Sequence, residues 1–144
     1  MASFEVSAAS PLLMSTRGKV LVVDDDTVVL RITRARLESA GFSVVTRDKA
    51  LGTTQAIINE KPDVILLDLD MPALRGDLLA ELLEKNLRTK DVPIIFHSNE
   101  DLFALQQKAR DAQAIGAIAK TGDDAVFLAQ FERLFIRSMR KATP

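Results

Sequence analysis

The chain of 144 residues lacks three features that would each point to a class of protein. It has no cysteine, which excludes disulfides and thiolate metal sites and fits the reducing cytoplasm that we predict as its compartment. No apolar stretch approaches the roughly 20 residues of a membrane-spanning helix. Neither charge is in excess, since 19 basic residues face 20 acidic ones and the net charge is −1. We therefore expect neither a membrane nor a nucleic acid as the main partner.

The N-terminal segment lacks the layout of a signal peptide. No basic residue precedes its short apolar run from Pro11 to Met14. We predict a flexible leader over residues 1–17 and one folded domain over residues 18–142, which is long enough to bury a core.

Two short apolar runs in this domain end in aspartates. The first is followed by Asp24, Asp25 and Asp26, and the second, which begins at Val64, is followed by Asp68. Each run is typical of a buried strand in a parallel sheet, and the carboxyl ends of such strands form the edge where ligands bind. Carboxylates that converge there repel one another unless a cation lies between them, and an all-oxygen set of ligands suits Mg²⁺. The runs therefore predict a metal site.

Two other predicted strands are followed by residues that can contact a phosphoryl group. Ser98 follows the strand over residues 92–97, and Lys120 follows the strand over residues 115–119. Acids for a metal, a lysine for an anion and a hydroxyl between them favour a phosphoryl-transfer site. Asp26 is predicted to cap the next helix. His97, the only histidine, is predicted to pack in the fold, because strand alternation turns it away from the face that Ser98 uses.

Apolar runs and amphipathic helices alternate along the whole domain. We predict strands over residues 20–23, 42–46, 64–68, 92–97 and 115–119. The first predicted helix ends at a left-handed cap on Gly41, and the second runs from near Asp48 to the residue before Lys61 with Leu51 buried. The third carries the leucines from Leu78 to Leu87, and the fourth includes Leu102 to Ala112. The fifth runs from Asp123 or Asp124 to about Lys141. Strands joined by crossover helices run parallel, so the predicted fold is a (βα)₅, doubly wound, flavodoxin-like α/β sheet.

Over about Lys19 to Met139 the chain resembles the receiver domain of response regulators, the phosphoacceptor module of two-component signalling. Five motif elements of that family occur in the right order and spacing: an acidic pair, a phosphoacceptor, a Met-Pro-x-x-x-Gly pattern, a switch hydroxyl and a lysine. The matching residues are Asp24 and Asp25, Asp68, Met71, Pro72 and Gly76, Ser98, and Lys120.

The resemblance implies a role for each residue. Asp68 would take a phosphoryl group from a histidine kinase or a phosphotransfer protein. Lys120 would pair first with the Asp68 carboxylate and then with a phosphoryl oxygen, and Ser98 would move inward to bond that group. Such a domain catalyses only its own phosphorylation and dephosphorylation and is otherwise not an enzyme. The implied Mg²⁺ ligands are the side chains of Asp25 and Asp68, the backbone carbonyl of Asp70 and, mainly through water, Asp24.

Three positions depart from the family pattern. Thr121 follows the lysine where proline is usual, and since a cis bond before threonine would cost ~3 kcal/mol, we expect Gly122 to supply the unusual dihedral angles. Asn99 follows the switch hydroxyl where a small residue is usual, and we expect it to narrow access to the site. Ala117 replaces the aromatic residue that couples to the hydroxyl, so we expect the signal to use another route.

Two alternatives belong to other classes of protein. A pseudo-receiver would bind partners without phosphorylation; the three departures favour it, and intact Asp25, Asp68 and Lys120 oppose it. A phosphatase of the haloacid-dehalogenase type would use Asp68 and Asp70 as nucleophile and acid/base. That family places these acids on its first strand and adds a cap domain, for which this chain has no room.

The last helix predicts a docking surface. It carries more apolar residues than one core-facing stripe needs, and we expect Phe127, Phe131, Leu134 and Phe135 in the core. We predict that the face formed by the fourth helix, fifth strand and fifth helix meets a downstream protein or a second copy, with a polar rim. The predicted rim residues are Arg110, Asp111, Arg133 and Arg137. Because the last helix ends near the end of the sequence, we expect regulation by docking without an attached output domain.

Overall fold

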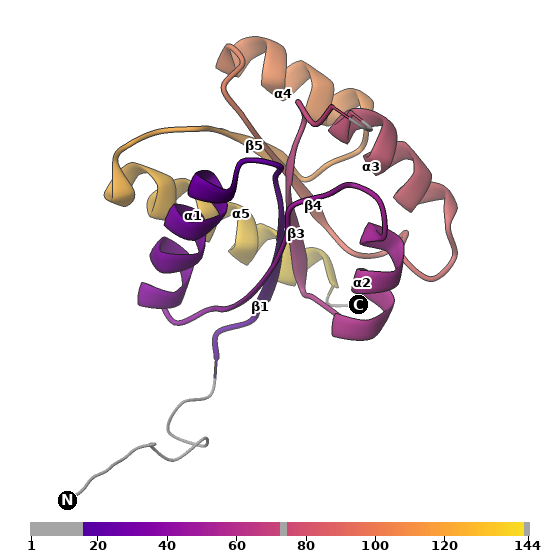
Figure 1. Cartoon of the computed structure of the whole chain (residues 1–144), viewed down its shortest axis with the longest axis horizontal. Helices are drawn as coiled ribbons and strands as arrows, with labels where there is room; N and C mark the ends of the chain where they lie inside the picture. The colour runs from indigo at the N-terminus through magenta and orange to yellow at the C-terminus, as the bar shows by residue number, and fades with distance from the viewer. Residues whose placement is uncertain (1–15, 73–74, 143–144) are drawn as a thin grey trace, which may run out of the picture.

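The computed structural model describes residues 16–72 and 75–142 (Figure 1). Strands and helices alternate, and the five strands form one parallel sheet in the order β2-β1-β3-β4-β5. This arrangement confirms the predicted (βα)₅ fold. The strands are β1 (Lys19–Val23), β2 (Ser43–Arg47), β3 (Val64–Asp68), β4 (Ile94–Ser98) and β5 (Gly116–Ala119). The helices are α1 (Thr27–Ser39), α2 (Thr53–Glu60), α3 (Gly76–Lys85), α4 (Leu102–Asp111) and α5 (Asp124–Ala142).

Helices cover both faces of the sheet. Figure 1 shows α1 and α5 on one side of the strands and α2, α3 and α4 on the other, and each side has its own apolar core. Because both faces are covered, every residue of β3 is buried, which explains its unbroken apolar run. The predicted core residues of α5 are all buried, and the rings of Phe127, Phe131 and Phe135 stack in sequence.

Helix α2 begins later than predicted. The sequence pointed to a start near Asp48 with Leu51 in the core, but α2 starts at Thr53 and Leu51 is 82% exposed. Gly52 has a φ of +89°, which lies outside the helical region and ends the turn that precedes the helix. Arg47 fixes that turn, because its guanidinium donates a hydrogen bond to the carbonyl oxygen of Leu51.

Two other local predictions were wrong. Leu87 lies beyond the end of α3 and is 82% exposed, because Asn86 has extended backbone angles that end the helix. Gly122 does not have a positive φ, and a Cβ atom on it would meet nothing within 4 Å. By contrast, Gly41 has the expected positive φ of 97°, and Asp26 caps α1 by accepting hydrogen bonds from two backbone amides of the first turn.

Most of the predicted leader lies outside the described residues. Arg17, which we assigned to it, contacts the folded domain: its guanidinium lies over the ring of Phe42, donates to the carbonyl oxygen of Ala40 and pairs with Glu132. The domain therefore includes Arg17. Among the described helices, none has the length and apolar character needed to cross a membrane.

Candidate functional site

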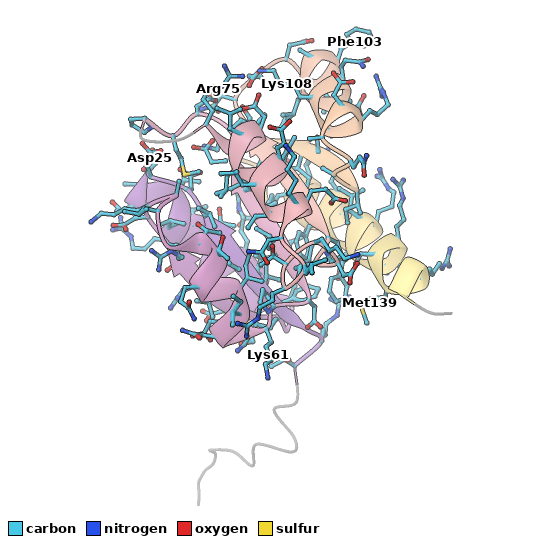
Figure 2. All side chains as sticks on the ribbon, turned by 90° about the vertical axis from the view of Figure 1, so that its right-hand side faces the viewer. Asp25, Lys61, Arg75, Phe103, Lys108 and Met139 are labelled. Carbon is cyan, nitrogen blue, oxygen red and sulfur yellow. The ribbon has the colours of Figure 1, made fainter. Side chains whose placement is uncertain are left out.

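Four strands bring the predicted site residues to one edge of the sheet. Asp24 and Asp25 follow β1, Asp68 ends β3, Ser98 ends β4 and Lys120 follows β5. The strands are parallel and in register, with Val23 beside Leu67 and Ser98 beside Ala119, so their carboxyl ends lie level with one another. Figure 2 shows Asp25 and Arg75 at this end of the molecule and Lys61 at the opposite end.

Lys120 lies between two buried carboxylates. Its Nζ atom is 2.8 Å from Oδ2 of Asp24 and 3.2 Å from Oδ1 of Asp68. The side chains of the two aspartates are 1% and 2% exposed, and that of Lys120 is 14% exposed. The backbone amide of Lys120 donates a 2.8 Å hydrogen bond to the carbonyl oxygen of Ser98, which anchors the lysine beside the end of β4. The resemblance to receiver domains implied the contact with Asp68 but not the shorter one with Asp24.

Burial and charge act in opposite directions on these groups. Burial and the nearby Asp24 carboxylate raise the pKa of Asp68, and Lys120 and the backbone amide of Asp70 only partly offset the rise. Burial lowers the pKa of Lys120, but the carboxylates of Asp24 and Asp68 outweigh burial, so its pKa lies above the ordinary value. Lys120 therefore stays charged at neutral pH and is the cation that allows two acids to be buried together.

The acidic cluster has the donor set of a hard cation. Carboxylate oxygens of Asp24, Asp25 and Asp68 lie within 4.8 Å of one another, and Asp25 is exposed to solvent. Three carboxylates face one ammonium, so negative charge remains in excess after Lys120 is counted. Oxygen ligands around an open position fit Mg²⁺, which commonly binds through one or two carboxylates and keeps several waters.

Gly76 allows the loop after β3 to return against the end of that strand. A Cβ atom on Gly76 would lie 2.2 Å from the carbonyl oxygen of Asp68 and 2.8 Å from Cα of Leu69. The Gly76 amide donates a 3.1 Å hydrogen bond to the carbonyl oxygen of Leu69, and Met71 is buried in the core on the α2, α3 and α4 side. The close backbone contact explains why position 76 is glycine, because any larger residue would push α3 away from the site.

Ser98 belongs to a second polar network beside the acidic cluster. Its hydroxyl donates a 3.1 Å hydrogen bond to Oδ2 of Asp70 and accepts one of 3.1 Å from the amide of Glu100. Glu100 in turn pairs at 2.7 Å with Lys108 of α4. The resemblance to receiver domains implied only a backbone role for Asp70, and the phosphatase alternative gave its side chain an acid/base role; neither predicted the hydrogen bond from Ser98.

The positions that depart from the family pattern have ordinary backbone geometry. All peptide bonds among the described residues are trans, including the one before Thr121. The Thr121 hydroxyl accepts a hydrogen bond from the amide of Asp123, and Asp123 caps α5 as predicted by accepting from the amide of Val126. Asn99 is exposed, and Ala117 is partly buried beside the core on the α4 side.

His97 lies in the core on the α1 and α5 side of the sheet. Its side chain is 2% exposed and its ring lies 5.5 Å from that of Phe127, in agreement with the predicted packing role. Burial, with smaller effects from the charges of Lys120 and Arg36, lowers the pKa of His97 to about 3. Its Nε2 atom is buried and has no hydrogen-bond partner among the described residues. The ring is therefore neutral in the folded protein at neutral pH.

Comparison with known proteins identifies one family. The sequence model of the response regulator receiver domain matches residues 20–132. Protein PilH of Pseudomonas aeruginosa is 31% identical over 99 residues, which are 65% of this chain and 82% of PilH. A probable transcriptional regulator of Guillardia theta, ycf27, is 37% identical over 82 residues, which are 57% of this chain and 31% of the relative. The chain thus spans about a third of that regulator.

A solved structure has the same fold as this chain. The structure of the chemotaxis protein CheY4 of Vibrio cholerae superposes with a TM-score of 0.75 at 24% identity and covers 83% of this chain and 99% of CheY4. At this identity the likeness concerns the fold, and the chemistry must be argued from the residues of the site.

Proposed function

Because the chain belongs to the response regulator receiver domain family, we propose that it accepts a phosphoryl group on Asp68 and signals through the resulting change in shape. The observation that carries this proposal is the convergence of three carboxylates and Lys120 at one edge of the sheet. The donor would be a histidine kinase or a phosphotransfer protein. The downstream partner would dock on the face formed by α4, β5 and α5, where a second copy of the chain is the alternative occupant.

In the proposed reaction, a carboxylate oxygen of Asp68 attacks the phosphorus atom of a phosphohistidine. A phosphorus–oxygen bond forms while the phosphorus–nitrogen bond breaks, and the histidine nitrogen leaves with the electron pair and takes a proton from water. Lys120 lowers the pKa of Asp68, against the rise that burial and Asp24 cause, and so favours the ionised carboxylate that must attack; it would then neutralise charge on a phosphoryl oxygen. A bound Mg²⁺ would supply further positive charge for the transferring group, held by Asp25, Asp68, the carbonyl of Asp70 and, through water, Asp24.

Ser98 is the proposed switch. Its hydroxyl bonds to Asp70, and it would turn from that carboxylate toward the new phosphoryl oxygen. The backbone amide of Glu100 also bonds to Ser98, and the Glu100 side chain pairs with Lys108 in the last turn of α4, so movement of Ser98 would pull the loop and, through this pair, α4. This route does not need an aromatic residue at position 117.

The test is incubation with acetyl phosphate and Mg²⁺ followed by intact-mass measurement. Wild type should gain the mass of one phosphoryl group, and Asp68→Asn should gain none. Asp91→Asn, which removes an exposed acid outside the cluster, should behave as wild type. Modification of Asp68→Asn would refute the assignment. A pseudo-receiver would gain no phosphate, and a haloacid-dehalogenase-type phosphatase would hydrolyse a small phosphate ester through many turnovers.

A further inference from the structure

A cavity lies between α1 and the end of β2, which is an edge strand of the sheet. Its volume is about 540 Å³, which is within the range of sites that bind small molecules. Arginine and threonine side chains make up most of its lining, and Leu30 of α1 adds an apolar wall. The cavity is therefore polar and rich in hydrogen-bond donors.

Three arginines line this cavity. Arg31 and Arg34 lie three residues apart on one side of α1, and Arg47 is the last residue of β2. No ion pair joins any of them to a carboxylate in the described part of the chain. The lining includes one acid, Asp48, so three guanidinium charges and one carboxylate leave a formal charge of +2. In a protein with a net charge of −1, this local excess of positive charge favours an anion.

Few of these donors are used within the described part of the chain. Arg47 donates from Nη2 to the carbonyl oxygen of Leu51, and its buried Nε atom has no hydrogen-bond partner there. The guanidinium of Arg34 makes one long contact, of 3.4 Å, with the hydroxyl of Thr46, which keeps its own hydrogen to donate. Because buried polar groups normally have partners, the unused donors indicate a ligand with several acceptor oxygens.

We propose that this cavity binds the phosphate monoester group of a small molecule, with the three arginines around the phosphate and the organic part in the remaining space. A phosphate monoester carries a charge of about −1.5 to −2 near neutral pH, which matches the excess charge of the cavity. Arginine holds phosphate through two parallel hydrogen bonds. The hydroxyl of Thr46 would donate a further bond, and Asp48 would accept one from a hydroxyl or amino group of the organic part.

The cavity is separate from the acidic cluster, although one hydrogen bond connects them. The backbone amide of Asp24 donates a 3.1 Å hydrogen bond to the carbonyl oxygen of Arg47, but none of the residues that line the cavity belongs to the cluster. An ester held by these arginines is thus a different ligand from a phosphoryl group on Asp68. Its binding does not depend on the proposed function.

The shape and surroundings of the cavity favour a small molecule over a polymer or a lipid surface. Nucleic acids and anionic membranes are bound by positive charge that extends over a surface, whereas these arginines converge on one cavity. Asp25, Asp26 and Asp48, at the same end of the molecule, are exposed acids that would repel an extended polyanion.

The experiment is a titration of the ¹⁵N-labelled chain with AMP, cyclic AMP and adenosine, in EDTA and at physiological ionic strength. The three probes share a base and a sugar but carry about two, one and no negative charges. We expect saturable shifts of amide resonances over residues 27–34 and 46–48. The affinity should fall about tenfold from AMP to cyclic AMP, and adenosine should not saturate these shifts.

A second set of probes tests the organic part of the ligand. Inorganic phosphate and glucose 6-phosphate are titrated under the same conditions. Because the cavity has room beyond the phosphate, at least one of the two monoesters, AMP or glucose 6-phosphate, should bind more tightly than inorganic phosphate.

Matched variants test the arginines. The double variant Arg31→Gln, Arg34→Gln keeps polar side chains on α1 but removes two charges, and its affinity for AMP should fall at least about tenfold. The double variant Arg133→Gln, Arg140→Gln removes two exposed charges from α5 and should bind AMP as wild type does. Arg47 stays intact in both variants, because it also holds the turn at Leu51.

Several results would overturn the proposal. These are equal binding of AMP and adenosine, equal losses in the two double variants, or binding of inorganic phosphate as tight as that of both monoesters. Tighter binding of a single-stranded oligonucleotide, or of phosphatidylcholine vesicles that contain phosphatidic acid, would assign the arginines to a polymer or a lipid surface instead. If AMP binds at the cavity but acetyl phosphate adds no phosphate to the chain, the phosphoacceptor assignment fails and the monoester site stands.

Discussion

At the scale of single residues, the ammonium group of Lys120 stabilises two buried carboxylates. Lys120 contacts both Asp24 and Asp68, and removal of its ammonium would leave two carboxylates buried against each other. Sequence patterns placed all three residues at one edge of the sheet, because apolar runs that end in polar residues fix where strands end. They did not show that Lys120 is shared, since the distance to Asp24 depends on how far the loops after β1 and β5 extend beyond their strands.

His97 provides a prediction about acid sensitivity. The ring is packed between Phe127 of α5 and the sheet, and the charges near it are Lys120 and Arg36, the latter paired with Asp124. Its pKa is about 3 in the folded protein and about 6.5 when exposed, so between these values the unfolded chain binds a proton that the folded chain does not. The stability of the fold therefore falls as the pH drops below about 6.5.

Replacement of His97 by leucine should remove this contribution. Between pH 7 and pH 5 the unfolding free energy of wild type should fall by about 2 kcal/mol more than that of His97→Leu. The reason is that each pH unit below the pKa of His97 in the unfolded chain lowers the stability by about 1.4 kcal/mol. Urea unfolding at the two pH values measures the difference. Equal losses in the two proteins would show that the buried ring does not control acid sensitivity.

Asp70 provides a prediction about the rate of phosphorylation. Its carboxylate accepts the hydroxyl hydrogen of Ser98, and it adds negative charge beside a site that must admit an anionic donor. Asp70→Ala should release Ser98 and speed modification by acetyl phosphate by about two- to tenfold, the equivalent of one hydrogen bond of about 0.5–1.5 kcal/mol.

The matched variant Asp70→Asn removes the charge but keeps an acceptor for Ser98. If Asp70→Asn speeds modification less than Asp70→Ala does, the difference between the two rates reports the hydrogen bond to Ser98. The increase that Asp70→Asn still shows reports the effect of charge. The rates come from intact-mass measurements over time. Slower modification of both variants would mean that the Asp70 side chain assists the reaction.

At the scale of elements, the first residue of α3 packs directly against the end of β3. Gly76 approaches the backbone of Asp68 and Leu69, which cannot move aside as a flexible side chain can. Gly76→Ala should lower the unfolding free energy by about 1–3 kcal/mol and slow phosphorylation, because the strand end that carries Asp68 must shift. Gly122→Ala is the control, since its Cβ would meet nothing within 4 Å, and its stability should stay within about 0.5 kcal/mol of wild type. Urea unfolding of both variants is the measurement, and equal effects would contradict the steric argument.

The elements that sequence patterns predicted best are those set by burial on both sides. Strand β3 matches its prediction, since a continuous apolar run between two layers of helices has few alternatives. The start of α2 was wrong because Leu51 and Gly52 form a turn whose geometry depends on Arg47. Only some of the many apolar residues of α5 are exposed. Phe127 and Phe131 are buried in the core, whereas Val126 and Ile136 lie at the surface. The spacing of apolar residues in the sequence does not show how much of the surface of α5 packs against the sheet.

At the scale of the whole molecule, metal binding at the acidic cluster would be coupled to folding. The acids of the cluster converge only when β1 and β3 pair, so the unfolded chain has no such site and a bound ion would stabilise the folded state. If the cluster is the proposed site, Mg²⁺ at about ten times its Kd should raise the unfolding free energy by about 1.4 kcal/mol, or Tm by about 4 °C.

Two neighbouring aspartates test whether the ion binds where we propose. Asp25 is exposed and belongs to the cluster, so Asp25→Asn should relieve repulsion among the carboxylates and melt slightly above wild type without metal, by less than about 1 kcal/mol. It should also lose the stabilisation by Mg²⁺. Asp26→Asn removes the adjacent negative charge but keeps an N-cap that asparagine supplies equally well, so it should keep the full response to Mg²⁺. Thermal unfolding of the three proteins with EDTA and with Mg²⁺ gives the comparison. An equal response of both variants would mean that Mg²⁺ acts through general screening of the acidic edge, and the proposed set of ligands would be wrong.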